Sequence, residues 1–258
     1  MHIVRLYLAS IKSQLSYPLD FVIQLLVWSI YSVCPLIAAN IMIQALPDAS
    51  QETQIFVNLC YGLVMVAFNL ARMFGRGFDD MGKLVLSGEL DVYFSRPFSI
   101  FVQVLSSQLF LRRLANIAVG IITLITVICK YHLSLEAIAL LIVIIFAAFF
   151  LFMSLLVITA ALSLVTVKAS NFASFICDTL TGIVHLLFEK PGGILELVIY
   201  YAVPIGLVVN TPLRTIISSG AQQIFSSCLL ACLVSAGYLC LAIVIFNVCL
   251  TKYESACA

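Results

Sequence analysis

The chain has 258 residues, of which 63% are hydrophobic and only 10% are charged, and its mean hydropathy is +1.17. Soluble globular domains are about 45–50% apolar and about 25% charged, so a water-soluble fold of this length could not cover so much apolar surface. The net charge of +1 gives no basic field suited to a nucleic-acid partner and no acidic tail. We therefore expect an all-α membrane protein with one transmembrane domain, residues 1–258, in contact with membrane lipid.

The first 18 residues and the apolar runs that follow them predict the membrane topology. Residues 1–18 place apolar side chains at helical spacing among polar ones, which is typical of an amphipathic helix in the cytoplasmic interface. A spanning helix needs about 20 mostly apolar residues. About six runs meet this requirement, the first with Pro35 as an expected kink: 19–43, 55–74, 114–131, 135–165, 170–188 and 224–250.

Residues 75–113 are expected to stay at the cytoplasmic face. The stretch 75–97 is the longest strongly polar one in the chain, and 98–113 ends in Arg112 and Arg113. If 98–113 began a span, these two arginines would lie near the middle of the bilayer, at a cost of several kcal/mol. We therefore expect a helix along the inner interface, started by Pro97, that turns into the membrane after Arg113.

Residues 189–219 predict an outer re-entrant region of two short half-helices. The apolar piece 195–211 carries Glu196 and is interrupted by Pro204. Irregular backbone at membrane depth is tolerated only where protein or water covers it. The sequence leaves open whether 195–211 is re-entrant or spans fully as a seventh helix.

Lysine and arginine set the orientation of the helices. With the N-terminus inside, only Lys130, Lys190 and Arg214 of the 13 basic residues face outward. We therefore expect a multi-pass protein of the cell (inner) membrane with both termini in the cytoplasm.

The sequence predicts no metal site and no nucleotide site. The nine cysteines stand singly, without a CxxC pair or a Cys/His cluster, and pack as small hydrophobic residues in such settings. Residues 77–83 match the GxxxxGK spacing of a phosphate-binding loop, which must follow a buried strand and be followed by Ser or Thr. Here a membrane span precedes the motif, and Leu84 takes the Ser/Thr position.

The segment between the second and third expected spans carries a family resemblance. The run Gly88-Glu89-Leu90-Asp91 is followed by Ser95-Arg96-Pro97-Phe98-Ser99. This order resembles the G-E-L-D…L-x-R-P-x-S signature of the permease subunits of type-2 ABC exporters, in the compact six-helix branch. The likeness extends more loosely over most of the chain. Tyr93 and Phe94 stand where this branch usually has leucine, and residues 189–193 match only loosely.

The resemblance implies a permease that pairs with a second copy or a homologous permease and docks on two cytoplasmic ABC ATPase subunits. The partner ATPase would bind ATP and magnesium, so this chain would hold no cofactor and perform no catalysis. The cytoplasmic coupling region would be 75–113, where mixed charges suit specific docking; an ordinary solvated loop is the alternative. The coupling residues would be Asp79, Asp80, Lys83, Leu84, Gly88, Glu89, Leu90, Asp91, Arg96 and Pro97.

Polar side chains within the expected spans are candidates for the translocation path. Asp178 is ionisable at membrane depth, which favours a functional role, although a hydrogen bond to a neighbour would also explain it. Glu196 faces the outer exit or is an ordinary surface carboxylate. The candidates are Gln24, Asn40, Asn58, Asn69, Asp178 and Glu196.

The leading hypothesis is an ATP-driven exporter of a lipid-like or amphiphilic substrate. The alternative is an ion-coupled secondary transporter, which would need several intramembrane carboxylates or broken helices in matching halves. An intramembrane enzyme would need a catalytic constellation that the spans lack, and an assembly protein would not depend on the coupling region.

Overall fold

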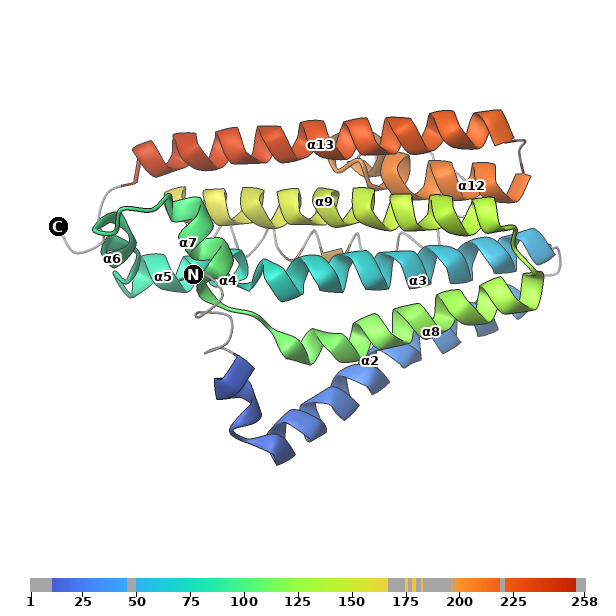
Figure 1. Ribbon diagram of the computed structural model, residues 1–258, viewed down its shortest axis with the longest axis horizontal. Coiled ribbons are helices and arrows are strands. Elements are labelled where there is room, and N and C mark those ends of the chain that lie inside the picture. The colour runs from blue at the N-terminus through green and yellow to red at the C-terminus, as the bar shows by residue number, and fades with distance from the viewer. Residues whose placement is uncertain are drawn as a thin grey trace.

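The computed structural model describes residues 11–45, 50–166, 175, 178–179, 182, 196, 198–218 and 221–253, and every element in these ranges is helical. Among the described residues, five helices are long and apolar enough to cross a membrane. They form an elongated bundle (Figure 1), which confirms the all-α membrane fold: α2 (Pro18–Gln44), α3 (Gln51–Phe74), α8 (Leu114–Tyr131), α9 (Leu135–Val165) and α13 (Ala221–Thr251). The expected span 170–188 lies almost entirely outside the described residues.

Capping residues explain where the long helices begin and end. Ser50 accepts a hydrogen bond from the Thr53 backbone N–H at 3.2 Å, so α3 begins about one turn before the apolar run. Ser134 caps α9 in the same way through the Ala137 N–H at 3.2 Å. The helix α2 is continuous through Pro35.

The centre of the bundle is built on α3 and α9. The helix α9 packs along α13 and against α3, and α3 packs against α8 (Figure 1). Gly62 and Gly120 face each other across the α3–α8 contact, and a Cβ atom on either would lie 3.0 Å from the carbonyl oxygen of the other. Small residues of this kind let two membrane helices approach closely.

Four short helices fold together at one end of the bundle: α4 (Arg76–Asp79), α5 (Met81–Leu86), α6 (Leu90–Phe94) and α7 (Ile100–Ser107). We call them the α4–α7 cluster. An extended link and η1 (Leu111–Arg113) separate α7 from α8, so 98–113 does not belong to a continuous span, as expected. The prediction that Pro97 starts the interfacial helix is wrong, because α7 begins at Ile100 with Ser99 as its N-cap.

The region before α13 is broken into short pieces. Two π-helical turns, η3 (Val198–Ala202) and η4 (Gly206–Asn210), flank the Pro204 region, and α12 (Thr211–Ser218) follows. The interruption agrees with the sequence, since proline removes a backbone donor. The helix α12 lies beside the start of α13, at the end of the bundle opposite the α4–α7 cluster (Figure 1). Re-entry into the outer leaflet stays a prediction.

Both described ends of the chain lie beside the α4–α7 cluster. Near the N-terminal end, Gln14 donates to the Leu109 carbonyl and accepts from the Leu111 N–H at 3.1 Å. At the C-terminal end, the Tyr253 ring stacks on Phe94 with centroids 5.8 Å apart. The helix α9 also ends near the cluster, whereas α12 lies at the opposite end of the bundle (Figure 1).

Candidate functional site

Aromatic side chains anchor the α4–α7 cluster to the bundle. Phe78 of α4 is 1% exposed, and its ring lies 5.1 Å from Phe101 of α7 and 5.8 Å from Phe246 of α13. Gly77 makes the contact between α4 and α7 close, because a Cβ atom there would lie 2.0 Å from the Val104 carbonyl oxygen. The cluster is therefore packed against the spans and does not hang from them as a loose loop.

Two of the proposed coupling carboxylates are paired within the chain. Asp79 Oδ2 lies 3.8 Å from Arg72 Nε, and Asp80 forms ion pairs of 2.9 Å with both Arg76 and Lys83. Burial raises the pKa of the Asp79 carboxyl, and the guanidinium groups of Arg72 and Arg76 oppose that rise. These contacts hold Asp79 and Asp80 inside the cluster and leave docking to the more exposed charges.

The other coupling residues divide by exposure. Lys83, with 77% of its side chain exposed, Glu89, Arg96 and Pro97 lie on the surface. Leu84, Gly88 and Asp91 are half-buried, and Leu90 is fully buried. Gly88 has a left-handed backbone with φ of 71°, a conformation that glycine adopts without strain.

The apolar surface of the cluster differs from what the sequence suggests. Leu90, one of the proposed coupling residues, lies in the core beside Val85, so neither side chain can act as an anchor for a partner. Leu86 is 70% exposed. Sequence reasoning missed Val92, Phe94 and Phe98, which are 51%, 48% and 59% exposed. We call Leu86, Val92, Phe94 and Phe98 the exposed apolar set of the cluster.

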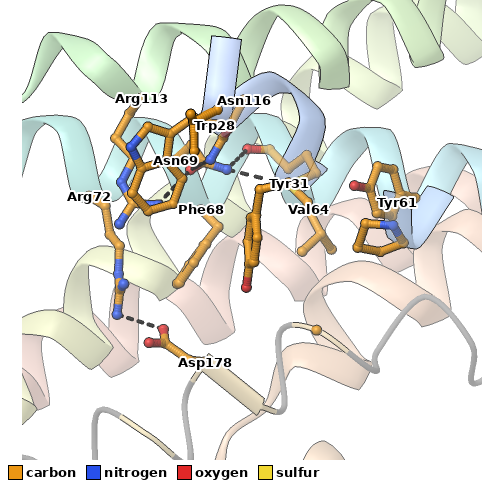
Figure 2. Close-up of a pocket in the computed structure, with 14 residues that line it drawn as sticks. Trp28, Tyr31, Tyr61, Val64, Phe68, Asn69, Arg72, Arg113, Asn116 and Asp178 are labelled. Carbon is orange, nitrogen blue, oxygen red and sulfur yellow. Dashed lines mark hydrogen bonds and ion pairs between the residues drawn. The ribbon is translucent and has the colours of Figure 1, made fainter. Parts of the chain in front are cut away.

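A cavity of about 460 Å³ lies between α2, α3, η1 and α8, beside residues 178 and 182. Figure 2 shows it as a space with charged side chains toward one end and aromatic side chains along its length. Its lining residues are Val27, Trp28, Tyr31, Pro35, Tyr61, Val64, Met65, Phe68, Asn69, Arg72, Arg113, Asn116, Asp178 and Gly182.

A polar network joins four helical elements at the wall of this cavity. Asn69 Oδ1 accepts from Asn116 Nδ2 at 3.0 Å and from Arg113 Nη1 at 3.3 Å. The Ser32 hydroxyl donates to Asn116 Oδ1 at 2.7 Å. The Arg113 guanidinium also lies 4.6 Å from the centroid of the Trp28 ring, within range of a cation–π contact. The network joins α2, α3, η1 and α8 around one buried arginine.

Arg72 connects the cavity to the α4–α7 cluster. Its Nη2 donates to Asp178 Oδ1 at 2.6 Å, and its Nε faces Asp79 of α4. The Arg72 guanidinium also lies 4.8 Å from the Phe68 ring centroid. One side chain at the end of α3 therefore touches a carboxylate of the cluster and a carboxylate at the cavity.

Of the six predicted path residues, the structure brings Asn69 and Asp178 to the same cavity. Gln24 donates instead to both carboxylate oxygens of Asp20, at 2.8 and 2.9 Å. Asn40 and Asn58 exchange hydrogen bonds of 2.9 and 3.0 Å, which tie α2 to α3. Glu196 lines a separate cavity of about 340 Å³.

Sequence reasoning missed Trp28, Arg113 and Asn116 as cavity residues. The sequence could have indicated Asn116, because a side-chain amide near the start of an apolar span needs a hydrogen-bond partner within the protein. Trp28 gave none, because aromatic residues are common in membrane helices. Among the described residues, no group of three or more His, Cys, Asp or Glu side chains could hold a metal ion.

The long apolar helices define a multi-pass membrane protein, with the α4–α7 cluster at one end and a cavity between the spans. A model of the ABC-2 family transporter proteins matches residues 30–257. The chain belongs to this family and is a permease component of an ABC transporter. Permeases of this family work with an ABC ATPase subunit. No curated protein and no solved structure gives a significant match.

Proposed function

We propose that this chain is the permease subunit of an ATP-driven ABC exporter and that it couples to separate ATPase subunits through the α4–α7 cluster. ATP and magnesium are bound on the partner ATPase, and the permease performs no covalent chemistry. The observation that carries this proposal is the construction of the cluster, which is firmly anchored and yet exposes both charges and apolar side chains. Mixed surfaces of this kind suit a specific protein partner.

The contacts of the cluster provide a route from the ATPase to the spans. Gly75 joins α3 directly to α4, and Phe78 packs on Phe246 of α13. Gln103 of α7 donates to the Tyr93 and Phe98 carbonyl oxygens at 3.0 and 2.8 Å, which holds α6 and α7 together. A push on α6 is therefore passed to α3 and α13 and rocks the bundle between inward-facing and outward-facing states.

The exposed surface of α2 supports pairing with a second permease. In the most apolar 18-residue stretch of α2, only 6% of the residues are buried inside the protein, whereas the corresponding share in α3 is 67%. Leu26, Ile30 and Tyr31 are 60%, 64% and 66% exposed. A second copy or a homologous permease covers part of this surface in the proposed dimer, and lipid covers the rest.

The cavity supports an amphiphilic cargo. Trp28, Tyr31 and Phe68 give it apolar walls, while Asn69 and Arg113 give it a polar wall. A lipid-like molecule has both kinds of surface, whereas a small ion would not need so much aromatic lining.

The docking proposal is tested by the Glu89→Lys variant. Glu89 is exposed on the cluster. A lysine at this position would repel a basic group of the ATPase that pairs with the Glu89 carboxylate. We expect at least a several-fold loss of ATPase that co-purifies with the permease, with membrane insertion unchanged. Asp91→Lys should act in the same direction.

The matched control is Glu136→Lys. Glu136 is also exposed but lies in the first turn of α9, at the end of the bundle away from the cluster (Figure 1). This control should retain the ATPase. Full retention by both Glu89→Lys and Asp91→Lys would refute docking through the cluster.

A further inference from the structure

We propose that the cavity between α2, α3 and α8 binds an amphiphile with an acidic oxyanion head group, and that Arg113 is the cation that holds this head. This proposal concerns binding alone. It rests on the proposed function only in taking the bound amphiphile to be the transported substrate.

Arg113 is a buried cation with spare hydrogen-bonding capacity. Its residue is 8% exposed, it lines the cavity, and among the described residues its guanidinium donates one hydrogen bond, from Nη1 to Asn69, while Nε is buried without a partner there. No carboxylate oxygen among the described residues lies within 4.0 Å of its guanidinium nitrogens. A buried charge is costly unless it is paired. The amide of Asn69 and the face of Trp28 provide only partial compensation.

The other cation of the cavity is already neutralised. Arg72 pairs with Asp178 at 2.6 Å and faces Asp79 at 3.8 Å. Arg113 is thus the lining cation that has no carboxylate oxygen within 4.0 Å among the described residues. A guanidinium presents donors in a fixed fork that matches a carboxylate or phosphate oxygen pair. The charge of the site therefore selects an acidic head over a neutral or zwitterionic one.

The shape of the cavity accounts for an apolar chain behind this head. Its lining residues on α3 run from Arg72 through Asn69 and Phe68 to Tyr61. This is three turns of helix, about 16 Å. Figure 2 shows Arg72 and Arg113 toward one end and Val64 and Tyr61 toward the other, with the Trp28, Phe68 and Tyr31 rings between them.

The cavity is reached from the surface of the bundle. Val27 and Tyr31 line it and are 58% and 66% exposed on α2. Since α2 is a spanning helix with an almost wholly exposed apolar surface, this side of the cavity meets lipid or a partner permease. An amphiphile dissolved in the membrane can therefore enter without crossing water.

The test uses Trp28, the only tryptophan of the chain and a wall of the cavity. The purified full-length permease in phosphatidylcholine nanodiscs is titrated with dodecyl phosphate that carries a bromine on its chain, because bromine quenches indole fluorescence on contact. We expect saturable quenching. The same brominated chain with a phosphocholine head should bind about tenfold more weakly, the size expected for losing charge-assisted hydrogen bonds. Inorganic phosphate should not compete.

Three variants assign the head-group contact. Arg113→Gln should weaken binding about tenfold, whereas Arg112→Gln is the matched control. Arg112 is the adjacent arginine, lies outside the cavity lining and pairs with Asp20 at 3.5 Å, so its variant should bind normally. Asp178→Asn removes a carboxylate that repels the head and should tighten binding. A gain of affinity cannot result from misfolding.

Equal affinity for the phosphate and phosphocholine amphiphiles would overturn the proposal, and so would normal binding by Arg113→Gln. Competition by inorganic phosphate would show a simple anion site instead. The measurement contains no ATPase, so its failure leaves docking through the α4–α7 cluster untouched. Conversely, if Glu89→Lys retained the ATPase, the proposal that the cavity binds an acidic amphiphile would still stand.

Discussion

Asp79 shows how burial shapes the electrostatics of single residues in the α4–α7 cluster. Burial raises the pKa of its carboxyl above the ordinary value of 3.8, against the effect of Arg72 and Arg76. The folded protein therefore holds the Asp79 proton more tightly than the unfolded chain does. The contribution of Asp79 to stability is full below its unfolded pKa and falls as the pH rises through its folded pKa.

Replacing Asp79 with asparagine should therefore change the pH dependence of stability. We expect the thermal midpoint of Asp79→Asn, minus that of the wild type, to increase from about pH 4 to about pH 7, because the variant lacks the ionisation that destabilises the native protein. The midpoint is measured in detergent by differential scanning fluorimetry. Glu89→Gln controls for the change in net charge. A difference that is flat or decreases with pH would contradict this assignment.

At the scale of elements, the fit of α4 against α7 depends on Gly77. A Cβ atom at this position would lie 2.0 Å from the Val104 carbonyl oxygen and 2.5 Å from Ser107 Oγ. Gly77→Ala should push the two helices apart and cost about 1–3 kcal/mol, the usual cost of overpacking. If the cluster transmits force to the spans, ATPase co-purification should fall as well.

The control for this variant is Gly237→Ala. Gly237 lies in α13, and a Cβ atom there would meet nothing within 4 Å. Alanine is the better helix former, so this variant should match or exceed the wild-type stability. Chemical denaturation of both proteins in the same detergent makes the comparison. Equal stability of Gly77→Ala and Gly237→Ala would show that the α4–α7 contact is looser than described.

The same elements show what the sequence could and could not predict. Long apolar runs determine spans such as 114–131 and 135–165, because a helix must satisfy its backbone within lipid, and α8 and α9 begin and end at these residues. Within the polar segment, Val85 and Leu86 look equivalent. One is buried and the other exposed, because three-dimensional packing of the short helices decides which side faces the core.

The cavity was beyond sequence reasoning for a similar reason. The sequence shows Asn69 as a polar residue within a span, but its partners Arg113 and Asn116 come from η1 and α8, and Ser32, which bonds Asn116, comes from α2. No local pattern states that these helices meet. The sequence predicts Arg113 at the membrane boundary, which keeps its charge out of the hydrocarbon core, but it does not indicate that Arg113 lines a cavity.

At the scale of the molecule, Arg72 places the cavity and the α4–α7 cluster in one chain of contacts. It lies 2.6 Å from Asp178 and 3.8 Å from Asp79. A displacement of α4 by an ATPase would alter the second contact and, through Arg72, the first. Any such coupling is reciprocal in free energy. Under the proposed function, occupancy of the cavity would therefore change the affinity of the permease for its ATPase.

The orientation of the whole molecule decides whether a cytoplasmic ATPase can reach the cluster. Ser87 is exposed in the cluster, and Leu135 is 82% exposed at the opposite end of the bundle. In intact cells, a membrane-impermeant maleimide should label Leu135→Cys and not Ser87→Cys. In inverted vesicles the result should reverse. Both substitutions are made in a background in which all nine native cysteines are replaced by alanine, so that the introduced thiol is the only one available for labelling. Labelling of Ser87→Cys from outside intact cells would place the cluster on the wrong side for an intracellular motor.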